Sequence, residues 1–252
     1  AVLGVNYPTA VAMAGDALLT LSEFNRVLST RHINTNHNGL DRVKQAVDSK
    51  FSTFNEIASS TDKPVRPETV IKALQNALDD DAIVCADPGT PCPYFSAFYR
   101  WPKTGRHFIT NRAHGALGYS LAAAIGAQVA RPNATVMAAM GDGSFAFSCG
   151  EMETVMRLNL PIKMIVFSNS VFGWIKAGQH SGFGKRYHNV DFTPTDHAAV
   201  ASAYGIKSWT LDNPAELQQT LQLALAHSGP TLIDIITQPL QETSAPVSEW
   251  VA

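Results

Sequence analysis

Two polar segments that follow apolar runs contain residues that could hold a metal ion. Asp142 lies in a Gly-Asp-Gly segment after the apolar run 135–140, and Asn169 directly follows the apolar run 163–168. The two residues are 27 positions apart (169 − 142), about one strand-helix-strand unit, so both side chains are expected at one edge of a parallel sheet. An isolated Gly-Asp-Gly is more often a tight turn, because Asp and Gly are common turn residues. The chemical interpretation therefore depends on the pairing with Asn169.

A carboxylate and an amide oxygen are ligands that suit Mg²⁺. This ion prefers six oxygen ligands, and it typically takes one or two carboxylates together with phosphate oxygens and water. We predict that Asp142, the Asn169 amide oxygen and the main-chain carbonyl of Val171 are its ligands. Gly143 and Ser144 would allow the backbone to approach an anion closely. The pattern therefore predicts a magnesium ion that carries a diphosphate.

The elements that position these residues follow an alternating pattern. From Pro67 onward, helical and strand patterns alternate, which predicts an α/β fold with a parallel sheet and helices on both faces. Ligands bind such sheets at the carboxyl ends of the strands. The predicted strands are 82–86, 106–110, 135–140, 163–168 and 231–236, and the predicted helices include 70–78, 117–130, 150–158 and 215–226. Before this region, residues 10–14 are expected to form a strand, followed by a helix with Asp16 as its N-cap.

The composition excludes several classes of protein. The chain is 45% hydrophobic and 16% charged with a net charge of -2, which is typical of a soluble globular protein and gives no basic surface for nucleic acid. Its apolar runs are shorter than the ~20 residues of a membrane-spanning helix, so no membrane association is expected. The three cysteines have no metal-ligand spacing and predict reduced thiols in a cytoplasmic protein. The eight histidines show no zinc-binding pattern.

The Gly-Asp-Gly segment with an Asn at this distance resembles the binding motif of thiamine-diphosphate-dependent enzymes. A second block, from His114 through a helix rich in small residues to Ala127, is similar to the acetolactate synthase group of that family. The resemblance extends over about residues 67–238. Ser168 stands in place of the first of two Asn residues that often close the family's motif, whereas Asn169 keeps the position of the metal ligand.

The resemblance implies a role for individual residues. The Gly115 carbonyl would accept a hydrogen bond from the 4′-amino group of the cofactor, and Leu117 would hold the cofactor in its bent form. The loop 87–91 would contact the diphosphate through Thr90, although a proline-rich surface turn is an equally good interpretation. The implied cofactor contacts are Thr90, His114, Gly115, Leu117, Gly141, Gly143, Ser144, Ser170, Phe172 and Gly173, and the residues expected to face substrate are Trp174, Lys176, Gln179 and His180.

The resemblance also implies parts that this chain does not contain. In the family, the glutamate that activates the cofactor comes from an N-terminal pyrimidine-binding domain of the same or a neighbouring subunit, and no segment here resembles that domain. The catalytic Glu is therefore expected outside this chain, in a homodimer or homotetramer. Residues 1–30 are expected to be the C-terminal remnant of the central domain, 31–65 a linker with room for a helix over 40–57, and 66–252 the domain that binds thiamine diphosphate and magnesium.

The expected activity is decarboxylation of a 2-oxo acid with transfer of the acyl group, as in acetolactate synthase. A simple decarboxylase of the benzoylformate or pyruvate type is an alternative within the family, and an oxidase would need a flavin site in the central domain. A binding module of the same fold without catalysis is a third interpretation, which the retention of both Asp142 and Asn169 disfavours. A nucleotide-binding Rossmann domain would need a Gly-x-Gly-x-x-Gly turn, and residues 87–91 do not provide one.

Overall fold

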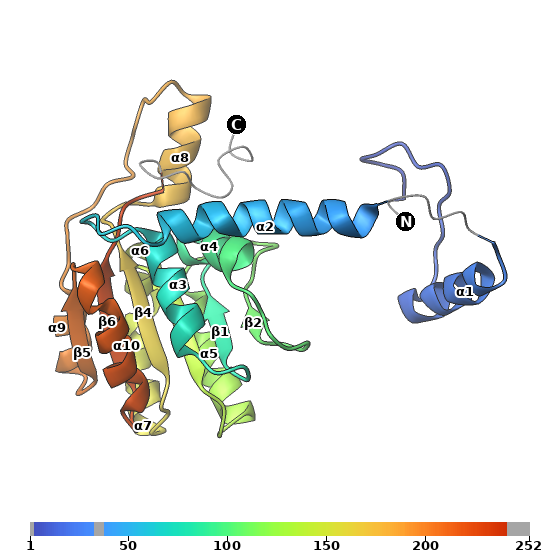
Figure 1. Cartoon of the computed structure of the whole chain (residues 1–252). Coiled ribbons are helices and arrows are strands. Elements are labelled where there is room, and N and C mark those ends of the chain that lie inside the picture. Colours follow the sequence, from blue (N-terminus) through green and yellow to red (C-terminus); the bar gives the residue numbers. More distant parts are fainter. Residues whose placement is uncertain (1–2, 33–37, 241–252) are drawn as a thin grey trace. The chain divides into compact units, whose positions relative to one another are not determined.

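Six short strands pair in parallel and form one sheet (Figure 1). The computed structural model, which describes residues 3–32 and 38–240, places them in the order β2-β1-β3-β4-β6-β5. Each strand is joined to the next along the chain through at least one helix, as parallel pairing requires. The strands are β1 (Ile83–Ala86), β2 (Phe108–Ile109), β3 (Val136–Gly141), β4 (Lys163–Ser168), β5 (Lys207–Leu211) and β6 (Thr231–Ile236). The predicted α/β fold is confirmed.

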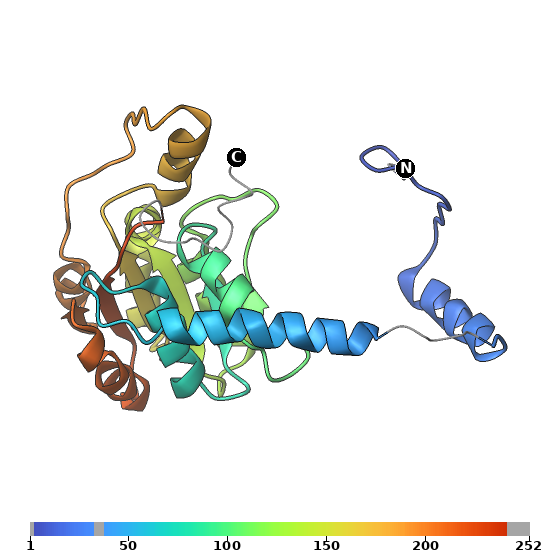
Figure 2. The ribbon, with the colours of Figure 1, turned by 45° about the horizontal axis from the view of Figure 1, so that its top comes forward.

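Helices cover both faces of this sheet (Figures 1 and 2). Side chains alternate between the faces along each strand. In β3, Met137 and Ala139 belong to one core, whereas Val136 and Ala138 belong to the other. The first core is closed by α3 (Pro67–Ala77), α4 (Pro91–Phe98) and α10 (Leu217–Ala226), and the second by α5 (Tyr119–Ala130), α6 (Asp142–Ser148), α7 (Met152–Arg157) and α9 (His197–Ala203). Burial on both faces explains why the central strands are almost continuous apolar runs.

The chain divides into two compact units between Val47 and Asp48. The first unit contains α1 (Ala17–Ser29), and Asp16 caps it as predicted by accepting a hydrogen bond from the Leu19 N–H at 3.0 Å. The predicted strand at 10–14 is wrong, because this segment is exposed and pairs with no strand among the residues that the structure describes. In the described part of the chain, no helix is long and apolar enough to cross a membrane.

Several boundaries differ from the predicted ones. The helix expected to begin at Leu117 begins two residues later, since Gly118 adopts a left-handed conformation with φ 81°. The helix predicted over 150–158 corresponds to α7, whereas α6, which begins at Asp142, was not predicted. Within the predicted linker, α2 (Gly39–Ile57) occupies the segment 40–57 that was expected to have room for a helix. Strand β5 lies at the edge of the sheet and was not predicted, because only Leu211 of its five residues is buried.

Glu68 in α3 provides a test of how burial affects stability. This side chain is 1% exposed, neither carboxylate oxygen has a hydrogen-bond partner, and its ion-pair partner Arg66 is 3.6 Å away. Burial raises the pKa of Glu68 above its usual 4.5, and the residue's own backbone N–H and the nearby Arg66 offset only part of this effect. The folded protein therefore loses stability as the pH rises from 4.5 through the raised pKa, because the buried carboxyl must then ionise.

We expect Glu68→Gln to raise the free energy of unfolding by about 1 kcal/mol at pH 7, since the neutral amide avoids this ionisation. The difference from wild type should shrink as the pH is lowered toward 4.5. Urea unfolding at a series of pH values measures it. A difference that does not depend on pH would contradict the assignment of the effect to ionisation.

Candidate functional site

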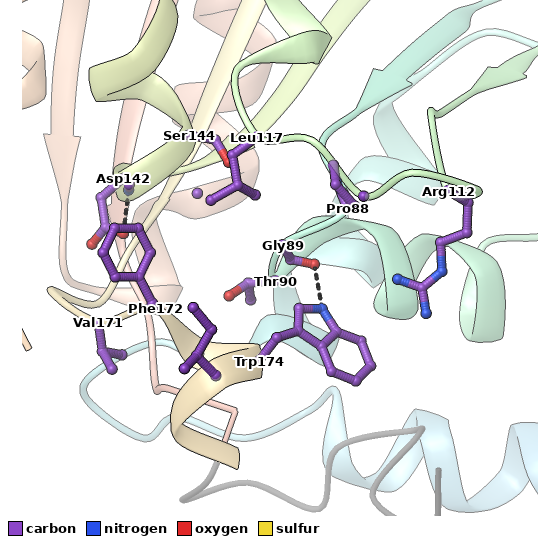
Figure 3. A pocket seen from close by; sticks show the side chains of 15 residues that line it. Pro88, Gly89, Thr90, Arg112, Leu117, Asp142, Ser144, Val171, Phe172 and Trp174 are labelled. Atoms are coloured by element: carbon purple, nitrogen blue, oxygen red, sulfur yellow. Dashed lines mark hydrogen bonds between the residues drawn. The ribbon is translucent and has the colours of Figure 1, made fainter. Parts of the chain in front are cut away.

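The carboxyl ends of three adjacent strands open into one cavity of about 310 Å³ (Figure 3). The segments after β1, β3 and β4 form most of its wall, and the loop before α5 forms the rest. These segments are far apart in the sequence, and the parallel sheet brings them to one edge. The lining residues are Pro88, Gly89, Thr90, Arg112, Gly115, Leu117, Gly141, Asp142, Gly143, Ser144, Val171, Phe172, Gly173, Trp174 and Ile175.

Most of the site residues expected from the sequence line this cavity. They are Thr90, Gly115, Leu117, Gly141, Asp142, Gly143, Ser144, Val171, Phe172 and Gly173. Asn169 and Ser170 do not line it, but their backbone N–H groups both bind the Asp142 carboxylate. His114 is exposed and lies outside the lining, so its contact with a cofactor stays a prediction.

The Asp142 carboxylate ties the end of β3 to the end of β4. Its Oδ1 accepts from the Gly143 N–H at 2.8 Å, and its Oδ2 accepts from the N–H groups of Asn169 at 2.7 Å and Ser170 at 2.5 Å. Ser170 adopts a left-handed backbone with φ 56°, which is uncommon for a residue with a side chain. Such strain persists where the surrounding structure enforces it, often at functional sites.

Asp142 and Asn169 both have unused capacity to bind a cation. Asp142 is 3% exposed and forms no ion pair with any residue that the structure describes. Burial raises the pKa of Asp142, while backbone hydrogen bonds from Asn169, Ser170 and Gly143 and the charge of His197 oppose that rise. The Asn169 Nδ2 donates to Thr90 Oγ1 at 3.4 Å, but its Oδ1 is buried with no hydrogen-bond partner. A divalent cation would neutralise the buried carboxylate and satisfy this oxygen, so the residues fit the predicted magnesium ion.

The donor set is also unlike that of a zinc site. Within residues 3–32 and 38–240, no three His, Cys, Asp or Glu side chains gather where they could hold a metal ion. A zinc site would need such a group, whereas Mg²⁺ is commonly held by one or two carboxylates and by phosphate oxygens.

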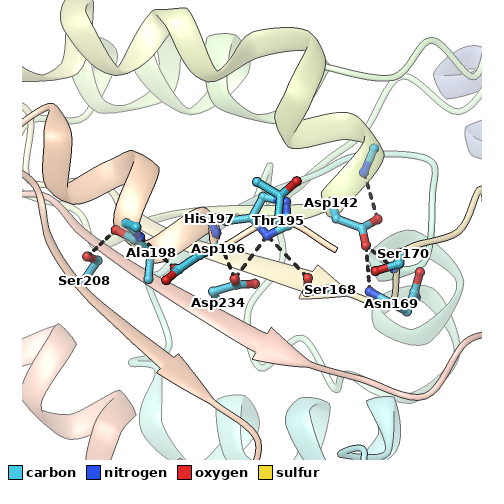
Figure 4. A network of polar contacts seen from close by, with 12 residues as sticks. Asp142, Ser168, Asn169, Ser170, Thr195, Asp196, His197, Ala198, Ser208 and Asp234 are labelled. Atoms are coloured by element: carbon cyan, nitrogen blue, oxygen red, sulfur yellow. Dashed lines mark hydrogen bonds and ion pairs between the residues drawn. The ribbon is translucent and has the colours of Figure 1, made fainter. Parts of the chain in front are cut away.

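A buried polar network supports the end of β4 (Figure 4). Ser168 Oγ lies 3.3 Å from His197 Nδ1, which is also 3.1 Å from Asp234 Oδ2. Asp234 Oδ2 accepts from the His197 backbone N–H as well, at 3.1 Å. The Ser168 hydroxyl is therefore bound within this network, and Ser168 is the residue directly before Asn169. Sequence reasoning missed it, because no local pattern links residues of β4, α9 and β6.

The segment after β1 is buried, so the alternative of a surface turn is wrong. Asp87 is fully buried, and its Oδ1 accepts from the Tyr119 N–H at 2.9 Å. Its Oδ2 accepts from the backbone N–H of Ser120 at 3.3 Å and from the Ser120 hydroxyl. Asp87 thus caps α5 from a distant point in the sequence. It fixes the loop that carries Thr90 against the loop that carries Leu117.

We expect Asp87→Ala to lower the free energy of unfolding by about 3 kcal/mol, because it leaves buried donors without an acceptor. The matched control is Asp196→Ala, which removes an exposed N-cap that accepts from the Ala199 N–H at 2.8 Å. The control should cost about 1 kcal/mol, the usual value for a cap in contact with water. Urea unfolding compares the two. Equal costs would show that burial of the Asp87 cap contributes nothing.

Of the four residues expected to face substrate, only Trp174 lines the cavity. Lys176 is paired with Asp191 at 2.5 Å, Gln179 binds the backbone of His188, and His180 bonds Tyr187, so these three are engaged elsewhere. Pro88 and Gly89 line the cavity within the loop 87–91 that was predicted to contact the diphosphate, whereas Arg112 and Ile175 line it and were not predicted. No motif contains them, and only the folded loops bring them to it.

Comparison with known proteins agrees with this geometry. The family model described as the C-terminal thiamine pyrophosphate (diphosphate) binding domain of thiamine pyrophosphate enzymes matches residues 87–235. A probable acetolactate synthase large subunit of Methanococcus aeolicus is 28% identical over 94% of this chain and 41% of its own length. The chloroplastic acetolactate synthase of Arabidopsis thaliana is 30% identical over 97% of this chain and 37% of its own length. The chain therefore spans less than half the length of the curated relatives it matches.

The family match covers the segments that form the cavity after β1, β3 and β4 and the loop before α5. Thiamine diphosphate, with Mg²⁺ as the usual metal, is the cofactor of this family. The chain belongs to the thiamine pyrophosphate enzymes, in their acetolactate synthase-like group, and carries their C-terminal cofactor-binding domain.

Proposed function

We propose that this chain binds thiamine diphosphate through a magnesium ion held by Asp142, the Asn169 amide oxygen and the Val171 carbonyl. The observation that supports this most directly is the Asn169 Oδ1, which is buried and has no hydrogen-bond partner. The backbone N–H of the same residue binds the Asp142 carboxylate, so both proposed ligands lie close together. Thr90 and Ser144 line the same cavity and offer hydroxyl groups to a diphosphate.

The rest of the cavity suits the ring end of such a cofactor. Leu117 lines it as a large apolar side chain, and we assign to it the support of the bent cofactor. Gly115 lines the same wall with its backbone in a left-handed conformation of φ 73°, and its carbonyl is the proposed acceptor for the aminopyrimidine. The bound cofactor supplies a thiazolium that stabilises a carbanion next to a carbonyl group. The protein's part is to orient the cofactor and exclude water.

We extend the proposal to an enzyme that acts on 2-oxo acids, by decarboxylation with acyl transfer as in acetolactate synthase. This choice is supported by relatives that are named acetolactate synthase and that match more than nine-tenths of this chain. The activating Glu is assigned to a pyrimidine-binding domain of the same or a neighbouring subunit, in a homodimer or homotetramer. Residues 1–30, 31–65 and 66–252 are assigned to a central domain, a linker and the cofactor domain. We also propose that the protein is cytoplasmic.

Calorimetric titration with thiamine diphosphate, in the presence of Mg²⁺ or of a chelator, tests the proposal. We expect saturable binding that requires Mg²⁺, because the metal joins the diphosphate to Asp142 and Asn169. Thiamine without phosphate is the matched control and should show no magnesium dependence. The natural full-length protein is titrated in parallel, so that a pocket completed by another domain is also tested. Binding that is the same with and without Mg²⁺, or absent in both proteins, would refute the proposal.

A further inference from the structure

Arg112 lies at the side of the cavity away from the predicted metal ligand. It comes from the loop between β2 and α5, and Figure 3 shows its side chain reaching toward Trp174, on the opposite side of the drawn cavity from Asp142. Arg112 and Asp142 are the two charged residues in the lining that the structure describes. If Asp142 faces the metal and the diphosphate, Arg112 is the cation left for another anion.

The Arg112 guanidinium contacts an aromatic ring, and this contact leaves its hydrogen-bond donors free to bind a ligand. Its Cζ lies 5.2 Å from the centre of the Trp174 ring, a cation–π distance. The Trp174 ring is itself fixed, because its Nε1 donates to the Gly89 carbonyl at 3.2 Å. The N–H groups of a guanidinium lie in its plane, so a contact with an aromatic face leaves them available. Within residues 3–32 and 38–240, the Arg112 guanidinium forms no hydrogen bond or ion pair.

The surroundings of Arg112 favour a ligand that is anionic at one end. Pro88, Leu117 and Ile175 line the cavity as apolar side chains together with Trp174. A planar guanidinium matches the two oxygens of a carboxylate, and the exposed Arg112 side chain is open to such a ligand. We infer that Arg112, supported by Trp174, binds the carboxylate of the 2-oxo acid substrate. This inference rests on the proposed function and names the residue that would select acids over neutral carbonyl compounds.

The test uses the natural full-length protein with Mg²⁺ and an inert thiazolone analogue of thiamine diphosphate, which blocks reaction at C2. Loading of wild type, Arg112→Gln and Lys176→Gln with the analogue is measured first by calorimetry. Each loaded protein is then titrated with pyruvate and with methyl pyruvate, a neutral ester of similar size. Lys176→Gln is the matched control, because it removes a nearby cation that is paired with Asp191 and does not line the cavity.

We expect pyruvate to bind wild type and Lys176→Gln with equal affinity and to bind Arg112→Gln about tenfold more weakly. Methyl pyruvate should bind all three proteins alike, since it has no carboxylate. Equal pyruvate affinity in wild type and Arg112→Gln would overturn the inference while leaving the proposed function intact. Failure of all three proteins to take up the cofactor analogue would overturn the proposed function, and the inference with it.

Discussion

Replacing Asp142 by asparagine is expected to weaken magnesium-dependent binding of thiamine diphosphate by at least about 100-fold, more than the usual effect of changing a residue behind a metal ligand. Asp142 is the single carboxylate among the proposed ligands, so the substitution removes all of the protein's negative charge at the metal. Asparagine keeps the shape of the side chain, and its oxygen can still accept from the Asn169 and Ser170 N–H groups. The loss is therefore expected in metal affinity rather than in folding.

Calorimetric titration with the cofactor, at several Mg²⁺ concentrations, measures this loss. Asp196→Asn is the matched control, because it neutralises an exposed carboxylate at the start of α9 and asparagine is an equally good N-cap. Thermal unfolding without cofactor checks that Asp142→Asn is folded, since its amide nitrogen would replace the oxygen that accepts from the Gly143 N–H. Unchanged magnesium dependence in a folded Asp142→Asn protein would remove Asp142 from the metal site.

Gly118→Ala is expected to lower the free energy of unfolding by about 3 kcal/mol, through backbone strain and overpacking together. Gly118 has φ 81°, a conformation that residues with a side chain rarely adopt. A Cβ at this position would lie 2.7 Å from the Cβ of Phe147 in α6, with the Phe147 carbonyl carbon at 3.6 Å. Relief of that overlap requires α5 and α6 to move apart, because the Phe147 Cβ is fixed to its backbone.

Gly115→Ala is the matched control, since Gly115 has a similar φ of 73° but no atom within 4 Å of an added Cβ. It should cost only the backbone strain, about 1 kcal/mol. Urea unfolding of both variants measures the difference, which is the cost of the contact with α6. Equal losses would show that α5 and α6 separate freely. We also expect Gly118→Ala to weaken cofactor binding, because Leu117 precedes it and Asp142 begins α6.

The fold was predictable from the sequence because burial on both faces makes the central strands continuous apolar runs. Apart from the short β2, the predicted strands agree with β1, β3, β4 and β6 to within one residue at each end. Strand β5 escaped prediction because it is an edge strand with mostly exposed residues. The segment 10–14 was wrongly predicted as a strand, since a short apolar run cannot form one without a partner to pair with.

Much of the candidate site could also be predicted from the sequence. Polar residues that directly follow strands must lie at the carboxyl edge of a parallel sheet, so the spacing of Asp142 and Asn169 was sufficient to bring them together. The same rule placed Thr90 after β1 and Phe172 after β4. These positions depend on local order along the chain, which the sequence determines.

Only the tertiary structure decided which long-range partners these residues have. The cap that Asp87 provides for α5, the contact of Ser168 with His197 and Asp234, and the cation–π contact of Arg112 with Trp174 each join segments far apart in the chain. Such contacts depend on the directions of loops and on side-chain packing, and no periodic pattern records them. The sequence by itself therefore determined the sheet and the edge that carries Asp142 and Asn169, whereas folding decided how that edge is supported and which cation faces the rest of the cavity.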